Sequence, residues 1–343
     1  MLPRIRDVHE PRDWARPWRD WPGFLLPNCP CCSTAAQLYT LGGVTSGSFP
    51  AGVPTADKTD FAAETTAAVA SANLSGNRCN SGTAANPGQA GYTLGGTASL
   101  TAAGELTTAD KTLFASDVTA AVATASLSQA REELAGISER TTKAYFGGGG
   151  QKIAGVLTAL ATADRLVFAS DTTGALGSAN LSLARKFPAG LTNGQTKGYW
   201  GGGFTGGTSA VVTTVDKLTF VNDTTGVQGS AALSAARLGL FAGSDGTTKG
   251  YWVGGQAGPP VGVIDKTMFA TDATSAIIPT LNRSQGASGA DGNKLLMMSG
   301  TTSDPSGQKF TFATESLAVV GIGNAGQLSV ARQACFGFST VGL

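Results

Sequence analysis

Three cysteines within four residues form the chain's densest group of potential metal ligands. Cys29, Cys31 and Cys32 carry thiolates that suit a soft metal ion or a cluster. No second cysteine pair or histidine follows at ligand spacing, so metal binding competes with contacts between subunits and with plain free thiols. The other two cysteines, Cys79 and Cys335, each follow a repeated arginine, which leaves a disulfide between adjacent repeats open.

The chain has one histidine, His9, which removes most histidine-based chemistry. A Ser-His-Asp relay within the repeats and a multi-histidine zinc or copper site both lack their central group. Glycine doublets are present, but no Lys-Ser/Thr pair and no helix follow them, as a Walker-type phosphate loop requires. A glycosidase needs two carboxylates that face each other, whereas the acidic residues here recur with a fixed period. We expect no enzyme, no catalytic residues and no cofactor.

Composition limits the partners of this 343-residue chain. Only 14% of its residues are charged and its net charge is +1, so we expect binding neither to nucleic acid nor to an anionic membrane surface. No apolar run reaches the eighteen or so residues of a membrane span. Charged residues between Arg4 and Asp13 interrupt any secretory signal, so export by that route is not expected.

Six imperfect copies of a unit of about fifty residues dominate the sequence. Each copy has an aromatic or apolar residue followed by a glycine doublet or its remnant, and the spacing between these markers is 53, 53, 54, 52 and 45 residues. The markers begin at Tyr39, Tyr92, Tyr145, Tyr199, Tyr251 and Leu296. We assign the five tyrosines a structural role, because a period of this length indicates units that bury their apolar faces against neighbours. The glycine doublets predict close backbone approach near the axis of the assembly.

A Leu-Ser-x-x-Arg element precedes the aromatic marker in most copies. Its arginines are Arg78, Arg131, Arg185, Arg237 and Arg332. The copy that runs from Leu281 to Gln285 has lost the arginine. We interpret the five arginines as structural, each opening a strand and donating hydrogen bonds to carbonyls of the neighbouring unit.

A charged pair and a phenylalanine follow each glycine doublet, with an acidic residue three positions after the phenylalanine. In the fourth copy these residues are Asp216, Lys217, Phe220 and Asp223. We expect the Asp-Lys pairs to be exposed ion pairs or turn clamps that contribute little individually.

Each unit is predicted to form four short β-strands. Leu218 and Phe220 alternate with Lys217 and Thr219, the period-two pattern of a half-buried strand. Small sheets of this kind can cover their faces by radial stacking, which predicts a six-bladed β-propeller over residues 37–343. A helical solenoid conflicts with the glycine doublets and threonine-rich stretches, and a parallel β-helix requires a much shorter repeat.

The termini indicate how the ring closes. The first unit starts at Tyr39 with no arginine element ahead of it, and the chain ends on an unpaired arginine element, Gln327–Ser339. We predict that this C-terminal segment pairs beside Leu38–Gly43 and completes the sixth blade.

The order of these markers resembles a kelch-type propeller blade, in which an arginine strand precedes an aromatic-Gly-Gly strand and an Asp-led strand. The resemblance covers residues 38–343, although the tryptophan expected near the fourth strand is absent from all six copies. The degenerate Gly-Tyr-(Trp/Phe)-Gly-Gly and Asp-Thr-Thr texture also resembles repeat domains of tailed-bacteriophage virion proteins. That resemblance implies a virion location in a tail, a fibre or a capsid-associated structure.

Residues 1–36 differ from the repeats in composition. They contain six prolines, which prevent a long helix, together with aromatic and basic residues that suit buried interface anchors. These are Trp14, Trp18, Trp21, Arg12, Arg16 and Arg19. We predict an extended arm that docks on another virion protein or on a sister subunit, within a homo-oligomeric assembly.

The preferred function is therefore a non-enzymatic structural or adhesion module of a phage particle, with a host-surface glycan as a further partner. Exposed loops such as Thr205–Thr213 and Gln256–Gly262 would face solvent or that glycan. The alternative is a kelch-like lectin or protein-interaction adaptor outside any virion.

Overall fold

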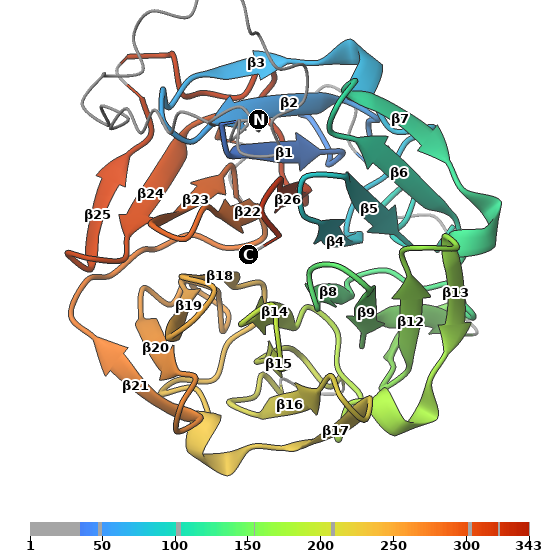
Figure 1. The fold of residues 1–343 in the computed structure, drawn as a ribbon, viewed down its shortest axis with the longest axis vertical. Helices are drawn as coiled ribbons and strands as arrows, with labels where there is room; N and C mark the ends of the chain where they lie inside the picture. Colours follow the sequence, from blue (N-terminus) through green and yellow to red (C-terminus); the bar gives the residue numbers. More distant parts are fainter. Residues whose placement is uncertain are drawn as a thin grey trace, which may run out of the picture. The chain divides into compact units, whose positions relative to one another are not determined.

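Six four-stranded antiparallel sheets stand around a central axis as the blades of a β-propeller (Figure 1). The computed structural model describes residues 35–46, 50–100, 104–153, 155–206, 210–300, 304–321 and 323–342. The predicted all-β, six-bladed fold is confirmed. The predictions for the N-terminal arm, including its tryptophans and arginines and Cys29, Cys31 and Cys32, lie outside the described residues.

The first blade joins the two ends of the propeller sequence. From the axis outward it contains β26 (Phe336–Ser339), β1 (Gln37–Leu41), β2 (Ala56–Asp60) and β3 (Thr66–Ala68). Strands β26 and β1 are antiparallel, with Tyr39 opposite Phe338. The prediction that the C-terminal strand closes the ring is therefore confirmed.

Each of the other five blades is built from strands that follow one another along the chain. The second blade contains β4 (Gly82–Asn86), β5 (Ala90–Leu94), β6 (Ala109–Leu113) and β7 (Val118–Ala121). The third contains β8 (Ala135–Ser138), β9 (Lys143–Gly147), β12 (Ala163–Val167) and β13 (Thr172–Ala175). The fourth contains β14 (Ala189–Thr192), β15 (Lys197–Gly201), β16 (Val215–Thr219) and β17 (Thr224–Val227).

The last two blades repeat this plan. The fifth contains β18 (Phe241–Ser244), β19 (Lys249–Val253), β20 (Ile264–Met268) and β21 (Ala273–Ile277). The sixth contains β22 (Ala287–Ala290), β23 (Lys294–Met298), β24 (Gly307–Thr311) and β25 (Ser316–Val319).

Two further kinds of element decorate the ring. A 3₁₀ turn follows the outer strand of each of the first four blades: η1 (Ala70–Ala72), η2 (Ala123–Ala125), η3 (Gly177–Ala179) and η4 (Gly229–Ala231). The loop between β9 and β12 contains a two-stranded hairpin, β10 (Gly150–Ile153) and β11 (Val156–Ala159).

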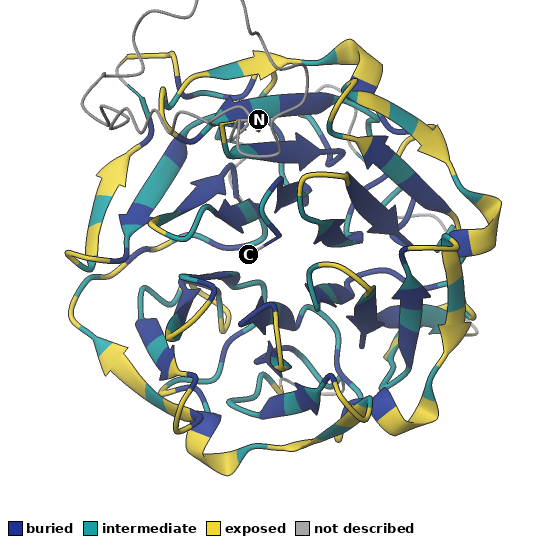
Figure 2. Cartoon of the chain, viewed as in Figure 1, coloured by how far each residue is buried: buried dark blue, intermediate teal, exposed yellow. Residues whose placement is uncertain are grey.

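The core lies between the blades, because each sheet is covered on both faces by its neighbours. Strand β15 is buried from Gly198 onward, whereas the outer strand β17 is mostly exposed, and the same gradient runs through every blade (Figure 2). Trp252 and Phe269 of the fifth blade pack against Tyr199 of the fourth. Burial of such large aromatic rings supplies the main stabilising term of each seam between blades.

The inner strands carry small residues because they approach one another closely. A Cβ atom added at Gly190 would lie 2.2 Å from the carbonyl oxygen of Gly136, on the neighbouring inner strand. Hydroxyl groups link these strands further, since Thr192 donates to the Ser138 carbonyl at 2.9 Å and Ser244 to the Thr192 carbonyl at 2.7 Å. The inner strands of all six blades enclose a central cavity of about 180 Å³.

Candidate functional site: blade seams and the mouth of the central cavity

The repeated arginines are buried and paired with the repeated aspartates. Arg131 and Asp164 are 2.7 Å apart and both side chains are fully buried. Four further pairs follow the same pattern: Arg78–Asp110, Arg185–Asp216, Arg237–Asp265 and Arg332–Asp57. Each arginine precedes an inner strand, and its aspartate lies on the third strand of that same blade. The arginines therefore fix the loop that enters each blade.

This geometry corrects two predictions. The arginine elements are loops rather than strand openings, since Arg237 lies four positions before the start of β18 at Phe241. The carbonyls that the arginine side chains bind lie in the blade they enter, as Arg78 shows by donating to the carbonyls of Gly95 and Thr108 at 2.8 Å each.

The copy between Leu281 and Gln285 has not lost its arginine function. Arg283 lies two positions earlier than expected, and its guanidinium donates to the carbonyls of Ser299 and Ser306 at 3.0 and 2.9 Å. Its carboxylate partner is Asp304, at 2.5 Å, because the usual aspartate position holds Gln308. The sixth blade thus rebuilds the pair from displaced residues, in a more exposed setting.

The glycine doublets are explained by contact between adjacent blades rather than by the axis. The nitrogen of Gly203, the second glycine, donates to the carbonyl of Arg237 in the next blade at 2.9 Å. A Cβ atom at Gly202, whose φ is +65°, would lie 2.4 Å from that same carbonyl oxygen. Only glycine combines this left-handed backbone with this approach, so the doublets are needed for packing.

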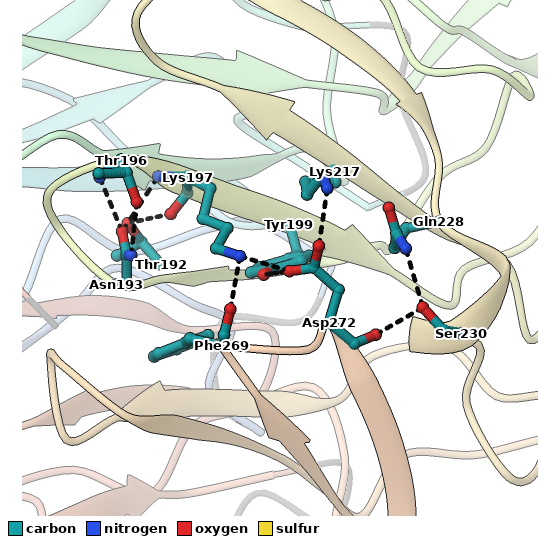
Figure 3. A network of polar contacts seen from close by, with 10 residues as sticks. All are labelled: Thr192, Asn193, Thr196, Lys197, Tyr199, Lys217, Gln228, Ser230, Phe269 and Asp272. Carbon is teal, nitrogen blue, oxygen red and sulfur yellow. Dashed lines mark hydrogen bonds and ion pairs between the residues drawn. The ribbon is translucent and has the colours of Figure 1, made fainter.

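A carboxylate at each seam collects donors from the preceding blade. Asp272, in the turn between β20 and β21, accepts hydrogen bonds from Lys197 at 2.6 Å, Tyr199 at 2.5 Å and Lys217 at 2.7 Å (Figure 3). The Tyr199 ring also stacks on Phe269, with centroids 6.0 Å apart. One tyrosine therefore joins two blades through both its ring and its hydroxyl.

The same arrangement recurs around the ring. Tyr39, Tyr92, Tyr145 and Tyr251 donate to Asp117, Asp171, Asp223 and Glu315, respectively. At the closing seam, where Leu296 replaces the tyrosine, Lys294 and Lys309 of the sixth blade donate to Glu64 of the first blade. The acceptor set is therefore present at all six seams, and the last one ties the ends of the propeller sequence together.

Of the two roles predicted for the Asp-Lys pairs, exposed ion pairs and turn clamps, the first is wrong. The two residues point to opposite sides of their strand, so Asp216 turns inward to Arg185 while Lys217 reaches Asp272 of the next blade. Adjacent strand residues alternate between faces, which prevents them from pairing with each other.

Four of the seam carboxylates are kept ionised by the donors around them. Burial alone would raise the pKa of Asp272, but hydrogen bonds from Lys197, Lys217 and Tyr199 outweigh it and lower the pKa to about 2. For Glu64, burial is likewise outweighed by Lys294 and Lys309, and the pKa falls to about 2. The pKa values of Asp223 and Glu315 are also lowered.

An arc of backbone hydrogen bonds crosses the mouth of the central cavity. The residue two positions after each arginine, or its equivalent, donates from its nitrogen to the carbonyl of the corresponding residue in the preceding blade. The five bonds of this arc, 2.7–3.2 Å long, connect Ala334, Asn80, Glu133, Phe187, Gly239 and Gln285 in that order. All six residues have positive φ, between +52° and +62°. The next residues along the chain line the cavity, so the arc lies at its rim; they include Ser81, Leu134, Pro188, Leu240 and Gly286.

A charged cluster lies at this mouth, in the sector of the second to fourth blades. Glu133 is 3.7 Å from Lys186, Glu105 is 3.6 Å from Lys152, and Glu132 accepts a hydrogen bond from Asn80 at 3.2 Å. Burial raises the pKa of Glu133 to about 8, although Lys186 opposes the shift. The cluster can therefore hold a proton near neutral pH. The sequence signal for it was the charged Glu132-Glu133 dipeptide directly after Arg131.

The two cysteines of the described residues are inert. Cys79 and Cys335 are both free and buried, so the disulfide left open by the sequence is absent between them. Burial raises the pKa of Cys79 to about 12, which keeps the thiol protonated.

Comparisons with known proteins identify no family for this chain, so a functional assignment depends on the geometry of the fold. A scan against protein-family models finds no match, and a search of curated proteins finds none either. Within the described ranges, no helix has the length and apolar character to span a membrane, and no three His, Cys, Asp or Glu side chains are grouped to hold a metal ion.

Proposed function

We propose that this chain is a non-enzymatic structural or adhesion module of a tailed-phage particle, anchored through residues 1–36. The observation that carries the proposal is the use of the repeated polar residues. The arginines and aspartates of the repeat pair within a blade, as Arg237 does with Asp265, and its tyrosines and lysines bind the next blade, as Tyr199 does through Asp272. Such a network suits a rigid frame.

The loops on one face of this frame differ from blade to blade. The loop between β9 and β12 carries the β10–β11 hairpin, whose Ile153 and Val156 are 52% and 67% exposed. In the fifth blade, residues 257–260 are exposed as well. Variable loops on a rigid scaffold are the usual place for recognition, which supports contact with a partner protein or a host-surface glycan.

The kelch-like order of the markers and the phage-like texture of the repeats support the remaining parts of the proposal. They favour a virion location and a homo-oligomeric assembly in which the N-terminal arm contacts other virion proteins. The proposal includes neither binding to nucleic acid nor insertion into a membrane. The net charge of +1 agrees with this choice.

Fractionation of a lysate from the producing cells tests the virion assignment. Particles are banded on a density gradient and probed with an antibody against residues 37–343. We expect the protein to band with intact particles and to stay with them after a high-salt wash. Protein found wholly in the soluble fraction would contradict the virion role and favour the adaptor or lectin alternative.

A glycan array tests the adhesion part separately. Full-length protein is applied beside a variant with Ile153→Ser and Val156→Ser in the exposed hairpin. Binding of host-type glycans by either protein supports adhesion, and its loss in the variant would locate it to the loop face. No binding at high protein concentration would exclude glycan adhesion and leave the structural role.

A further inference from the structure

The seam between the fifth and sixth blades lacks a piece of chain that other seams possess. Strand register makes Ala276 equivalent to Val227, since they pair with Asp265 and Asp216. Ten positions separate Val227 from Arg237, whereas seven separate Ala276 from Arg283. The shorter link has no 3₁₀ turn.

After the first, third and fourth blades that turn exchanges hydrogen bonds with the next blade. Ser230 of η4 donates its hydroxyl to the Asp272 carbonyl at 2.9 Å. The outer strand of the next blade also donates to the turn: the Thr225 hydroxyl of the fourth blade donates to the carbonyl of Ala179 in η3 at 3.0 Å. The small last residue of each turn, such as Ala179 or Ala231, is completely buried.

The sixth blade has adjusted to the missing turn. Leu317 occupies the position that Thr225 holds in the fourth blade, so no hydroxyl faces the place where a turn carbonyl would lie. Gln308 replaces the aspartate that elsewhere accepts a backbone hydrogen bond from the link, as Asp265 does from Ser234 at 3.1 Å. Within the described part of the chain, the side chains of Gln308 and Asn282 have no hydrogen-bond partner.

The result is an open depression of about 380 Å³, which we call the seam notch. It is lined by Thr280, Leu281, Asn282, Gln308, Leu317, Ala318 and Val319. Val319 is 61% exposed, and Ile278 on the shortened link is 96% exposed. The notch continues the established interface between these two blades, which holds below it through Tyr251, Lys266 and Glu315.

The closing seam shows that another segment can serve in place of the 3₁₀ turn. There the link after β25 is longer, and its Gly321 nitrogen donates to Glu64 at 3.2 Å while Ala325 accepts from the Thr66 nitrogen of β3 at 2.7 Å. Backbone groups of a segment that is not a 3₁₀ turn can therefore fill the same place at a seam.

We propose that the seam notch is a docking site for a short turn of a partner polypeptide, with a small apolar residue next to a serine or threonine. Gly229–Ala231, the turn after the fourth blade, has this chemistry. In the seam notch, the hydroxyl of such a turn would donate to the Glu315 carbonyl, and its backbone groups would bind the side chains of Gln308 and Asn282. The inference deepens the proposed function by naming a surface that binds a partner. It rests on the proposed function in one respect only, namely that the partner that supplies the turn is a virion protein.

A peptide with the sequence of Val227–Leu233, which spans the fourth 3₁₀ turn, tests the site. Fluorescently labelled peptide is titrated with the full-length protein, and a scrambled peptide serves as a control. We expect saturable binding of the first peptide alone. Val319→Glu should weaken it at least tenfold, whereas Val227→Glu should leave it unchanged, because Val227 has the same 61% exposure at the equivalent place in a complete blade.

A second variant keeps the test decisive if the peptide binds weakly. Insertion of Gly-Ser-Ala after Ile277 restores the length of the link and should fill the seam notch from within the chain. We expect it to raise the melting temperature and abolish peptide binding. The proposal is overturned if wild-type protein gives no saturable binding, if Val319→Glu and Val227→Glu bind alike, or if the filled variant binds as wild type does.

Sedimentation distinguishes a second copy from a foreign partner. A dimer of the full-length protein that Val319→Glu dissociates would place a sister chain in the seam notch and overturn the foreign-partner assignment. These outcomes are independent of particle fractionation, so failure of the docking site and failure of the virion role can be told apart.

Discussion

Arg237 and Asp265 form a fully buried pair in which each charge depends on the other. Both side chains have no solvent exposure, and burial lowers the pKa of Arg237 while Asp265 opposes that shift. Removal of one partner leaves an uncompensated charge in a low-dielectric interior, which is far more costly than the loss of an exposed ion pair.

Asp265→Asn should therefore destabilise the propeller by about 3–5 kcal/mol, measured by urea denaturation. Asp304→Asn is the matched control, because it breaks the equivalent pair of the sixth blade where the aspartate side chain is 39% exposed. We expect about 1 kcal/mol or less from that change. Equal losses from the two variants would show that burial does not decide the strength of these pairs.

The seam carboxylates predict how stability responds to acid. Asp272 and Glu64 have folded pKa values of about 2, below the values of about 4 expected in an unfolded chain. Their contribution to stability is complete above the unfolded pKa and is lost as the pH falls from about 4 to 2. We expect the melting temperature to drop steeply over that window. Asp272→Asn should lower stability at pH 7 and flatten the drop, and an unchanged slope would contradict this account.

Glu133 predicts the opposite response, a loss of stability as the pH rises. Its folded pKa of about 8 lies above its unfolded value of about 4, so stability is lost as the pH rises from about 4 to about 8, and the loss is complete above pH 8. Glu133→Gln should therefore stabilise the protein at pH 9 relative to wild type, with the difference vanishing below pH 4. Melting curves across that range measure it, and a constant offset at every pH would refute it.

At the scale of elements, the loop after each second strand is shaped by its glycine doublet. Gly202→Ala would place a Cβ atom 2.4 Å from the Arg237 carbonyl and strain a backbone at φ +65°. Gly206→Ala, in the same loop, would cause only backbone strain at φ +89°, because no atom lies within 4 Å of its Cβ position.

We expect Gly202→Ala to cost about 3 kcal/mol and Gly206→Ala about 1 kcal/mol in the free energy of unfolding. Denaturant titration of the two variants measures the difference. Equal costs would mean that contact between blades contributes nothing to the requirement for glycine at the doublet.

Elements were the level at which the sequence was most informative. The period of Tyr39, Tyr92 and their successors predicted the four-stranded blades, because each blade needs the same apolar face. The displaced Arg283 could not be recognised, since a shorter link moved it out of register and its partner Asp304 came from a different loop. The cluster around Glu133 was missed because its residues meet only after separate blades come together.

The ion-pair partners of the repeated charged residues could not be predicted from the sequence either. Asp216 and Lys217 are adjacent in the chain, yet their partners Arg185 and Asp272 lie about thirty and fifty residues away on different elements. A regular motif predicts that contacts repeat, but the register between blades decides which contacts they are.

At the scale of the whole molecule, closure depends on one short strand. β26 brings Phe336 and Phe338 into the first blade and is preceded by Arg332, which pairs with Asp57 at 2.8 Å. Deletion of residues 328–343 removes all of these contacts and leaves Asp57 without its cation.

We expect that deletion to lower the melting temperature by about 10 °C or more, because two buried aromatic side chains and a buried ion pair are lost. Calorimetry of the truncated protein measures the effect, and removal of residues 342–343 alone serves as the control. An unchanged melting temperature for the long deletion would contradict closure through β26.

The backbone arc at the cavity mouth has a consequence for how this protein can diverge. Its bonds run between main-chain atoms of residues as unlike as Ala334, Glu133 and Phe187, so they make no demand on side-chain identity beyond tolerance of positive φ. Side chains can therefore change at these positions while the five backbone hydrogen bonds of the arc are kept. The propeller therefore has five neighbouring non-glycine positions beside the central cavity whose backbone hydrogen bonds do not depend on the side chain.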